Sequence, residues 1–212
     1  LAALLDTHPT LVCECAGHGA VDAYAEAALL AGVDVLLVSV GALSDAARAQ
    51  RLEAAAVQGN CQLSLASGAI GGLDWLVSAR TAGLSRVVYR GRKPPLAWSG
   101  TVAESLLNLK ALQTAEVFFR GTAREAASRF PKNANVAATV GLASLGMDAT
   151  RVELIADPAV TDNVHEVEAI SEAGTLHIRL SGKPDPLNPK TSMITAHSAV
   201  RVILRRCDAM IV

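Results

Sequence analysis

The sequence predicts an α/β protein with an incomplete, doubly wound parallel sheet, followed by an α+β region with a mixed or antiparallel sheet and closed by a C-terminal helix. Two observations predict this fold class. Short apolar runs alternate with helical runs over the first third of the chain, which is typical of parallel βαβ units. After residue 86 the alternation gives way to a Pro-containing loop, an uncharged helical run and two neighbouring strand-like segments, which indicates an α+β region.

The parallel sheet is expected from three apolar runs, at residues 10–15, 33–40 and 62–66. The second run (VDVLLVSV) is almost continuously apolar, as in a strand that is covered on both faces. Helices are expected after these strands, at residues 21–31, 44–57 and 73–82. Gly32 can end the first helix, and Ser44 can cap the start of the second.

Further strands are expected in the α+β region, at residues 86–89, 117–120, 164–170 and 176–180. The last two are joined by a short turn in which Gly174 can take a positive φ, which favours an antiparallel pair. Residues 91–100 are expected to form a loop. Helices are expected at residues 123–130, 135–145 and 191–205, with Thr191 and Ser192 as caps of the last one.

Composition and charge exclude several classes of function. A net charge of −1 provides no field for holding nucleic acid or an anionic membrane. The longest uncharged helical run, residues 133–147, is shorter than the roughly 20 apolar residues of a membrane span. The four cysteines lack zinc or redox spacing, so we expect no metal site and interpret them as reduced, buried thiols of a cytoplasmic protein. Cys13 and Cys15 are expected to lie too far apart along their strand to pair easily.

Small residues follow each strand of the expected parallel sheet, in the segments 16–19 (AGHG), 39–42 (SVGA) and 66–69 (ASGA). Ligands bind at these carboxyl ends in open parallel sheets, and small side chains allow a flat ligand to lie against the backbone. Tight turns after strands also favour glycine for purely structural reasons. The pattern alone therefore leaves both interpretations open.

A phosphate-binding G-x-G-x-x-G loop is not found in the sequence. Either the protein does not bind a dinucleotide, or the first βαβ unit is missing. Because the chain starts at Leu1 inside a helix-like segment, we expect an N-terminal truncation.

A histidine in the expected antiparallel pair is the first candidate for chemistry. In the sequence VHEVEA, alternation places His165, Val167 and Ala169 on one face of the strand and Glu166 and Glu168 on the other. Since the glutamates favour water, His165 is expected to face the covered side. A lone histidine there is more often a hydrogen-bonded core residue than a catalyst.

Two expected helix starts carry groups that can hold an anion. Asn133 and Asn135 stand at the start of the uncharged helix, and Lys190, Thr191 and Ser192 stand at the start of the final helix. A helix N-terminus attracts negative charge, and these side chains can donate hydrogen bonds. Each set can equally be an ordinary helix cap.

Six segments, taken in order, resemble the L-aspartate dehydrogenase family: VCECAGHGAV (12–21), LLVSVGALSD (36–45), SGAIGGLD (67–74), FPKNANVAATVGLA (130–143), NVHEVEA (163–169) and NPKTSMITAHSAV (188–200). They cover nearly the whole chain at about the family's spacing. The resemblance implies that residues 1–68 are the remainder of an NAD(P)-binding Rossmann domain and residues 69–187 a catalytic and dimerisation domain. Residues 188–212 would then form a helix that returns to the nucleotide-binding domain.

The resemblance also implies the reaction and the roles of three residues. His165 corresponds to the family's active-site histidine, and Ala69 and Asn135 correspond to its nicotinamide-cofactor contacts. With NAD or NADP, L-aspartate is oxidised to iminosuccinate, which hydrolyses to oxaloacetate and ammonia or feeds pyridine nucleotide biosynthesis. The implied partner is this small-molecule substrate, and a cytoplasmic homodimer is expected.

The assignment of donors to the substrate rests on position and chemistry alone. The two carboxylates of the substrate need donors, and Lys190, Thr191 and Ser192 are the candidates. The residues that select NAD or NADP have no counterpart in the sequence. The alternatives are a related amino-acid or imine dehydrogenase of the same architecture and an inactive truncated chain.

Overall fold

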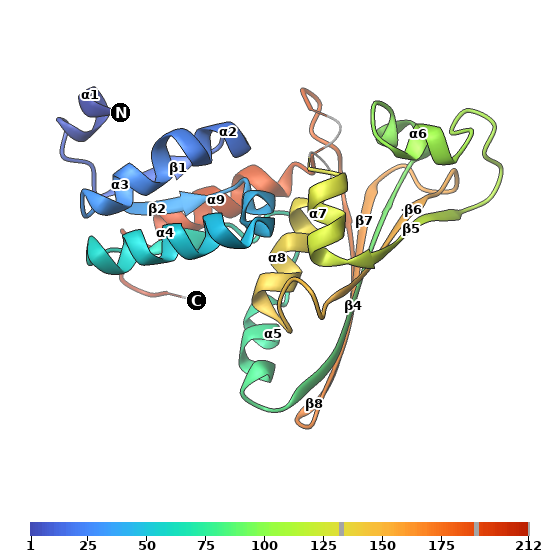
Figure 1. The fold of residues 1–212 in the computed structure, drawn as a ribbon. Coiled ribbons are helices and arrows are strands. Elements are labelled where there is room, and N and C mark those ends of the chain that lie inside the picture. The colour runs from blue at the N-terminus through green and yellow to red at the C-terminus, as the bar shows by residue number, and fades with distance from the viewer. Residues whose placement is uncertain (132–133, 189–190, 212) are drawn as a thin grey trace.

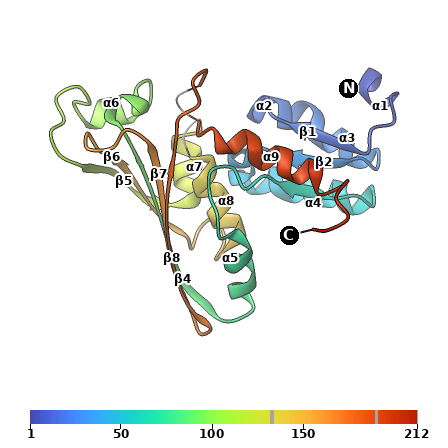
Figure 2. The ribbon, with the colours of Figure 1, turned by 180° about the vertical axis from the view of Figure 1, so that it is seen from behind.

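The computed structural model describes residues 1–131, 134–188 and 191–211 and contains two sheets. The first is a parallel sheet of order β1-β2-β3, formed by β1 (Leu11–Glu14), β2 (Asp34–Leu37) and β3 (Leu63–Leu65). The second sheet is mixed and has the order β5-β6-β4-β7-β8. Figures 1 and 2 show the two sheets as separate lobes, with helices lying between them. The predicted fold class is confirmed.

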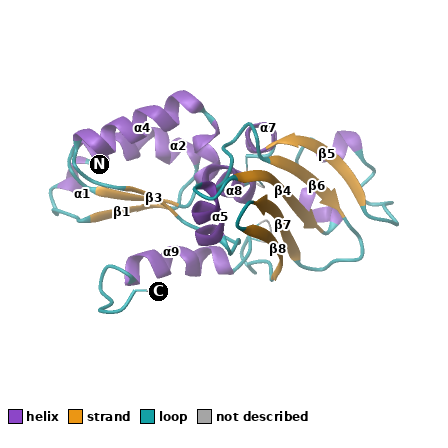
Figure 3. Ribbon diagram, turned by 90° about the horizontal axis from the view of Figure 1, so that it is seen from below, coloured by secondary structure: helices purple, strands orange, loops and turns teal. Residues whose placement is uncertain are grey.

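Helices cover both faces of the parallel sheet, as the continuous apolar run in β2 predicted. After α1 (Ala2–Leu5), the helices α2 (His18–Ala20), α3 (Glu26–Leu30) and α4 (Ala46–Gln58) lie on one face, and a π-helical segment, Val21–Ala25, joins α2 to α3. The C-terminal helix α9 (Ile194–Leu204) lies on the other face (Figure 3). Within β2, Val35 and Leu37 pack on the first face, and Leu36 packs with Ala199 of α9 on the second.

The end of the apolar run after β2 differs from the prediction. The strand stops at Leu37, and Val40–Ser44 forms a turn of 3-10 helix whose first four residues are all buried. Residues 38–40 continue the apolar run because they lead into this buried turn. A buried turn and a buried strand both consist of consecutive apolar residues, so the sequence could not distinguish them. Asp45, whose carboxylate accepts a hydrogen bond from the Arg48 N–H, caps α4 in place of the predicted Ser44.

The second sheet contains β4 (Leu84–Lys93), β5 (Glu116–Thr122), β6 (Arg151–Ala156), β7 (Asn163–Ser171) and β8 (Gly174–Gly182). The antiparallel pairing of β7 with β8 is confirmed, and Gly174 has a positive φ of 142° at the turn. The prediction missed β6 and ended β4 four residues too early. Lys93, which was placed in a loop over residues 91–100, lies at the end of a strand. A 3-10 turn, Pro95–Trp98, and the short helix α6 (Ala103–Leu106) follow it.

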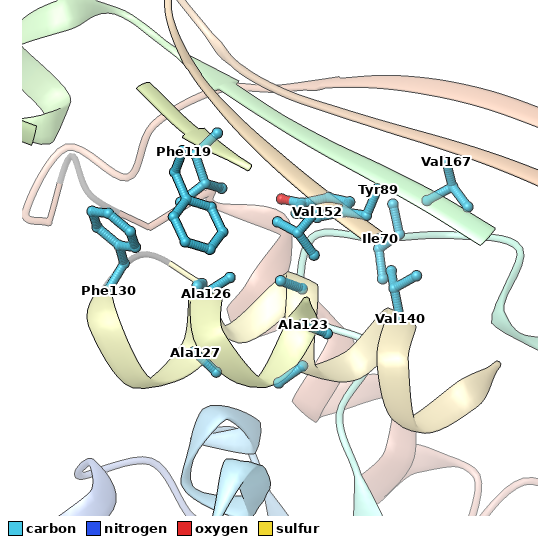
Figure 4. Packing of buried hydrophobic residues seen from close by; sticks show 14 of the residues in the cluster. Ile70, Tyr89, Phe119, Ala123, Ala126, Ala127, Phe130, Val140, Val152 and Val167 are labelled. Atoms are coloured by element: carbon cyan, nitrogen blue, oxygen red, sulfur yellow. The ribbon is translucent and has the colours of Figure 1, made fainter. Parts of the chain in front are cut away.

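The main core lies between the second sheet and three helices, α5 (Leu73–Arg80), α7 (Ala123–Arg129) and α8 (Asn135–Ala143). Figure 4 shows the large side chains of Tyr89, Phe119 and Val152 facing the small residues of α7. Small helical residues allow close packing: a Cβ on Gly141 of α8 would lie 2.9 Å from the Cβ of Ala123. The uncharged helix α8 is buried here, with residues 137–141 inside the core.

Two sequence predictions about the C-terminal helix and the cysteines are corrected. The final helix begins at Ile194 rather than at residue 191, and neither Thr191 nor Ser192 caps it. None of the four cysteines is buried as predicted: Cys15 and Cys207 are exposed, and Cys13 and Cys61 are partly exposed. The Cys13 and Cys15 sulfurs lie 3.4 Å apart, closer than predicted, although all four cysteines are free thiols.

In the described part of the chain, none of the helices combines the length and the apolar character that crossing a bilayer requires.

Candidate active site

A pocket of about 900 Å³ lies between the two lobes, at the carboxyl ends of β1, β2 and β3. Its walls come from the turns after these strands, from α8, from the ends of β4 and β7, and from α9. This volume is within the range of roughly 300–1,000 Å³ found for small-molecule sites. A ligand in it would therefore contact both sheets at once.

The pocket contains His165, which lies on β7 and is only 3% exposed. The Nδ1 atom of its ring is 2.8 Å from the hydroxyl oxygen of Tyr89, and the two rings are stacked with centroids 6.0 Å apart. Burial, and then the positive charge of Lys93, lower the pKa of His165 to about 3. The imidazole is thus neutral at pH 7, and Nε2 is the ring nitrogen left for a ligand.

The face assignments along β7 agree with the predicted alternation. His165, Val167 and Ala169 are buried on the side of the helices. On the other face, Glu166 pairs with Arg179 and Glu168 pairs with Arg90. The two faces of this strand could be predicted from sequence because both of its glutamates fall on one face, and charged side chains favour the outer side of a sheet.

Asn135 connects the two lobes beside the pocket. Its Oδ1 accepts a hydrogen bond of 2.9 Å from the Gly41 N–H, which lies in the turn after β2. Asn135 is the first residue of α8 and does not cap it, because the N-cap position is Ala134. A backbone N–H can only donate, so Oδ1 faces Gly41 and Nδ2 is the donor that remains. The close approach leaves no room for a Cβ at Gly41, which would lie 2.6 Å from Oδ1.

Ala69 lines the pocket in the turn after β3, next to Gly68. Gly68 has a φ of +64°, and no heavy atom beyond its chain neighbours lies within 4 Å of the position where its Cβ would be. Its N–H donates to the hydroxyl of Ser198, which fixes α9 against this turn. The backbone at Gly68 therefore has open space beside it.

Glu14, at the end of β1, holds two of the strand-end turns together. Its carboxylate accepts hydrogen bonds from the N–H groups of Ala16 and Gly17 after β1, and from the N–H and hydroxyl of Ser39 after β2. Nothing in the sequence distinguished this glutamate, because one of its partners, Ser39, lies 25 residues further along the chain. It shapes the floor of the pocket and is buried beneath it.

Thr191 and Ser192, two of the three predicted carboxylate donors, line the pocket, and the third, Lys190, lies outside the described residues, as does Asn133. Ser192 is 4% exposed, and its hydroxyl accepts a hydrogen bond of 3.3 Å from the Nδ2 of Asn163 on β7. The Asn188 amide donates to the Thr191 hydroxyl at 3.0 Å.

Three further pocket features were not predicted. Lys93 and His18 line the pocket, and Tyr89 lies behind His165. Burial, and then the charge of Arg48, lower the pKa of His18. Lys93 was missed because β4 was predicted to end too early, and Tyr89 because no pattern in the sequence pairs it with His165.

Residues 74–206 match the family described as "Aspartate dehydrogenase, C-terminal". The L-aspartate dehydrogenase of Cupriavidus taiwanensis is 52% identical over 97% of this chain and 77% of its own length, and that of Pseudomonas aeruginosa is 50% identical over 95% and 76%. The chain belongs to the L-aspartate dehydrogenase family. The crystal structure of aspartate dehydrogenase from Thermotoga maritima matches with a TM-score of 0.80 and 30% identity, over 96% of this chain and 78% of that one.

The first lobe has a separate match, since residues 1–66 match the family described as "Homoserine dehydrogenase, NAD binding domain". The residues present fit the nicotinamide half of such a cofactor. The open backbone at Gly68 provides space for a flat ring, and the Asn135 amide provides a donor. Of the six site residues predicted from sequence, five line this pocket: Ala69, Asn135, His165, Thr191 and Ser192.

Proposed function

We propose that this protein oxidises L-aspartate with NAD(P)+ in the pocket between its two lobes, with His165 as the catalytic residue. The observation that carries the proposal is a buried, neutral histidine facing the same pocket as Ala69 and Asn135, in a chain of the L-aspartate dehydrogenase family. The products are iminosuccinate, or oxaloacetate and ammonia after its hydrolysis, together with NAD(P)H and a proton.

His165 accepts the proton in this reaction. The α-amino group must lose its proton before its lone pair can form the C=N bond of the imine, so a neutral base is needed beside it. The reaction requires the tautomer in which the Nδ1–H of His165 donates to the Tyr89 oxygen, because the lone pair of Nε2 is then directed to the pocket. The bound cofactor provides the acceptor for the hydride from the substrate α-carbon.

Ala69 and Asn135 are the proposed contacts of the nicotinamide portion. The Asn135 amide is held rigidly, because its oxygen is bonded to the Gly41 N–H, and its Nδ2 can donate to a carbonyl oxygen. Ala69 has a side chain small enough for a ring to lie against the turn after β3. A rigid donor loses little conformational freedom when a ligand binds.

Lys190, Thr191 and Ser192 are the proposed donors to a substrate carboxylate. Thr191 and Ser192 line the pocket wall next to His165, and their hydroxyls can donate to a carboxylate oxygen. The hydrogen bond from Asn163 to Ser192 uses the lone pair of that hydroxyl and leaves its proton available.

A substrate panel tests the function. The purified protein is incubated with NAD+ or NADP+ and L-aspartate, L-homoserine or L-alanine, and the reduced cofactor is measured by absorbance. We expect a rate with L-aspartate that is at least about tenfold above the others. A higher rate with homoserine or alanine would support a related amino-acid dehydrogenase instead.

We further propose that the protein works as a homodimer in the cytoplasm. Free cysteines are typical of a reducing compartment, and the apolar residues Ile194 and Leu204 on α9 are about half exposed. Association would cover such apolar groups. Light scattering on the purified protein gives the oligomeric state, and a monomer at micromolar concentration would contradict the dimer.

A further inference from the structure

The pocket has a buried lysine to which none of the roles above applies. Lys93 is the last residue of β4 and is 4% exposed, and it lines the pocket. It lies two residues beyond Gly91, the residue that pairs with His165 across the sheet. Because side chains alternate along a strand, Lys93 is on the same face as Gly91, toward the helices and the pocket.

The environment of Lys93 favours a positive charge held in a fixed place. Its Nζ lies over the ring of Trp98, 5.3 Å from the centroid, where the ring attracts a cation. Trp98 is itself fully buried and donates a hydrogen bond to the carbonyl of Ile155. The rigid indole therefore limits the positions that the ammonium group can take.

The charge balance of the pocket indicates what this ammonium group can bind. Among the described residues that line the pocket, Lys93 is the only lysine or arginine, and aspartate and glutamate do not line it. The Glu14 carboxylate beneath the floor is already bonded to the turns after β1 and β2. Both histidines there have lowered pKa values and are neutral at pH 7. A low-dielectric site with a fixed positive charge strongly favours an anion over a neutral ligand.

We propose that Lys93 binds a carboxylate of the dicarboxylic substrate and thereby selects dicarboxylates over monocarboxylates. This inference rests on the proposed function, which supplies a substrate with two carboxylates. Thr191 and Ser192 then bind the second carboxylate from the wall formed by the residues before α9. The amino group between the carboxylates is placed near His165, since Lys93 and His165 are on neighbouring strands.

Binding has a consequence for His165 that supports the assignment. The charge of Lys93 contributes to the low pKa of His165 in the free protein. A carboxylate on Lys93 would offset this charge, and the pKa of His165 would rise toward the value at which a base is effective. The same contact would thus anchor the substrate and adjust the catalytic base.

The test uses Trp98 as a reporter of the site. The chain has two tryptophans, so a Trp75→Phe variant emits from Trp98 alone, next to Lys93. Succinate, an unreactive dicarboxylate, is titrated into this variant, with propionate as the monocarboxylate control. We expect succinate to change the emission and propionate to need at least about tenfold higher concentration. Equal emission changes with succinate and propionate, or no change with either, would overturn the proposal. This test leaves Lys93 itself unchanged.

A second series changes the lysine. Lys93→Met keeps a side chain of similar length and should raise the succinate Kd and the aspartate KM by about 10- to 100-fold, as expected when a charged hydrogen bond is lost. We expect a much smaller change in kcat and an NADH Kd within about twofold. Lys93→Arg should recover part of the affinity, and Lys110→Met, at an exposed lysine, should have no effect.

Two outcomes separate this inference from the proposed function. Succinate affinity and aspartate KM within about twofold of the unsubstituted values in Lys93→Met would overturn the role of Lys93. The opposite outcome is succinate binding that depends on Lys93, in a protein that does not reduce NAD(P)+ with L-aspartate. It would contradict the proposed reaction but support an anion site at Lys93.

Discussion

Replacing His165 with alanine tests the catalytic assignment, and the structure sets the size of the effect. Loss of a positioned base lowers kcat by about 10²- to 10⁴-fold, or roughly 3–5 kcal/mol of transition-state stabilisation. Asn135 and Ala69 lie on other elements, so we expect the NADH Kd to stay within about threefold. The substitution also leaves the buried Tyr89 hydroxyl without its Nδ1 partner, which should cost about 1–3 kcal/mol of stability.

The assay separates these two effects. Steady-state kinetics with L-aspartate give kcat, NADH fluorescence gives the Kd, and urea denaturation gives the free energy of unfolding. Tyr89→Phe is the matched control, because it removes the same hydrogen bond and keeps the imidazole. It should lose stability of a similar order, but its kcat should fall far less than that of His165→Ala, because Tyr89 only holds the imidazole in place. A kcat for His165→Ala within about threefold of the unsubstituted protein would refute the catalytic assignment and make His165 a core residue.

Three further predictions concern the cofactor contact, the acid stability and the pocket floor. Asn135→Ala should raise the NADH Kd by up to about tenfold, the worth of one neutral hydrogen bond, with a smaller effect on the aspartate KM; a lower melting temperature with unchanged NADH affinity would mean a purely structural role. Burial lowers the pKa of His165 from 6.5 to about 3, so its contribution to stability is complete above pH 6.5 and is lost as the pH falls toward 3, by up to about 1.4 kcal/mol per pH unit. Urea denaturation between pH 7 and 5 measures this slope, which should be smaller in His165→Gln; equal slopes would contradict a buried neutral imidazole. Glu14→Gln loses part of the acceptor capacity that holds the turns after β1 and β2, and should both lower the melting temperature and weaken NADH binding, whereas the exposed Glu116→Gln should do neither.

The parts of the fold that were predictable are those with a local period. The βαβ alternation predicted the parallel sheet, and alternation in VHEVEA placed His165 on the buried face. The same signal was present in β6, where Val152, Leu154 and Ala156 face the core and Glu153 does not, but this strand was not predicted. Its omission left the second sheet without its link between β4 and β5.

The pocket is formed by contacts between residues far apart in the sequence, which local sequence patterns cannot predict. The bond from Gly41 to Asn135 joins residues 94 positions apart, and the Tyr89–His165 pair joins residues 76 apart. Position alone left two interpretations of Asn135, a helix cap and a polar anchor for a ligand, whereas in the structure its side chain connects the two lobes. For Asn135 and Ala69, a role at the cofactor follows from the resemblance to the family and not from any local pattern.

The central claim is that L-aspartate is oxidised in this pocket, and product stoichiometry tests it most directly. With L-aspartate and NAD+ or NADP+, the purified protein should form reduced cofactor, oxaloacetate and ammonia in equal amounts. Under the same conditions His165→Ala should form about 10²- to 10⁴-fold less of all three. Reduced cofactor without oxaloacetate, or equal amounts of product from the protein and its His165→Ala variant, would contradict the account.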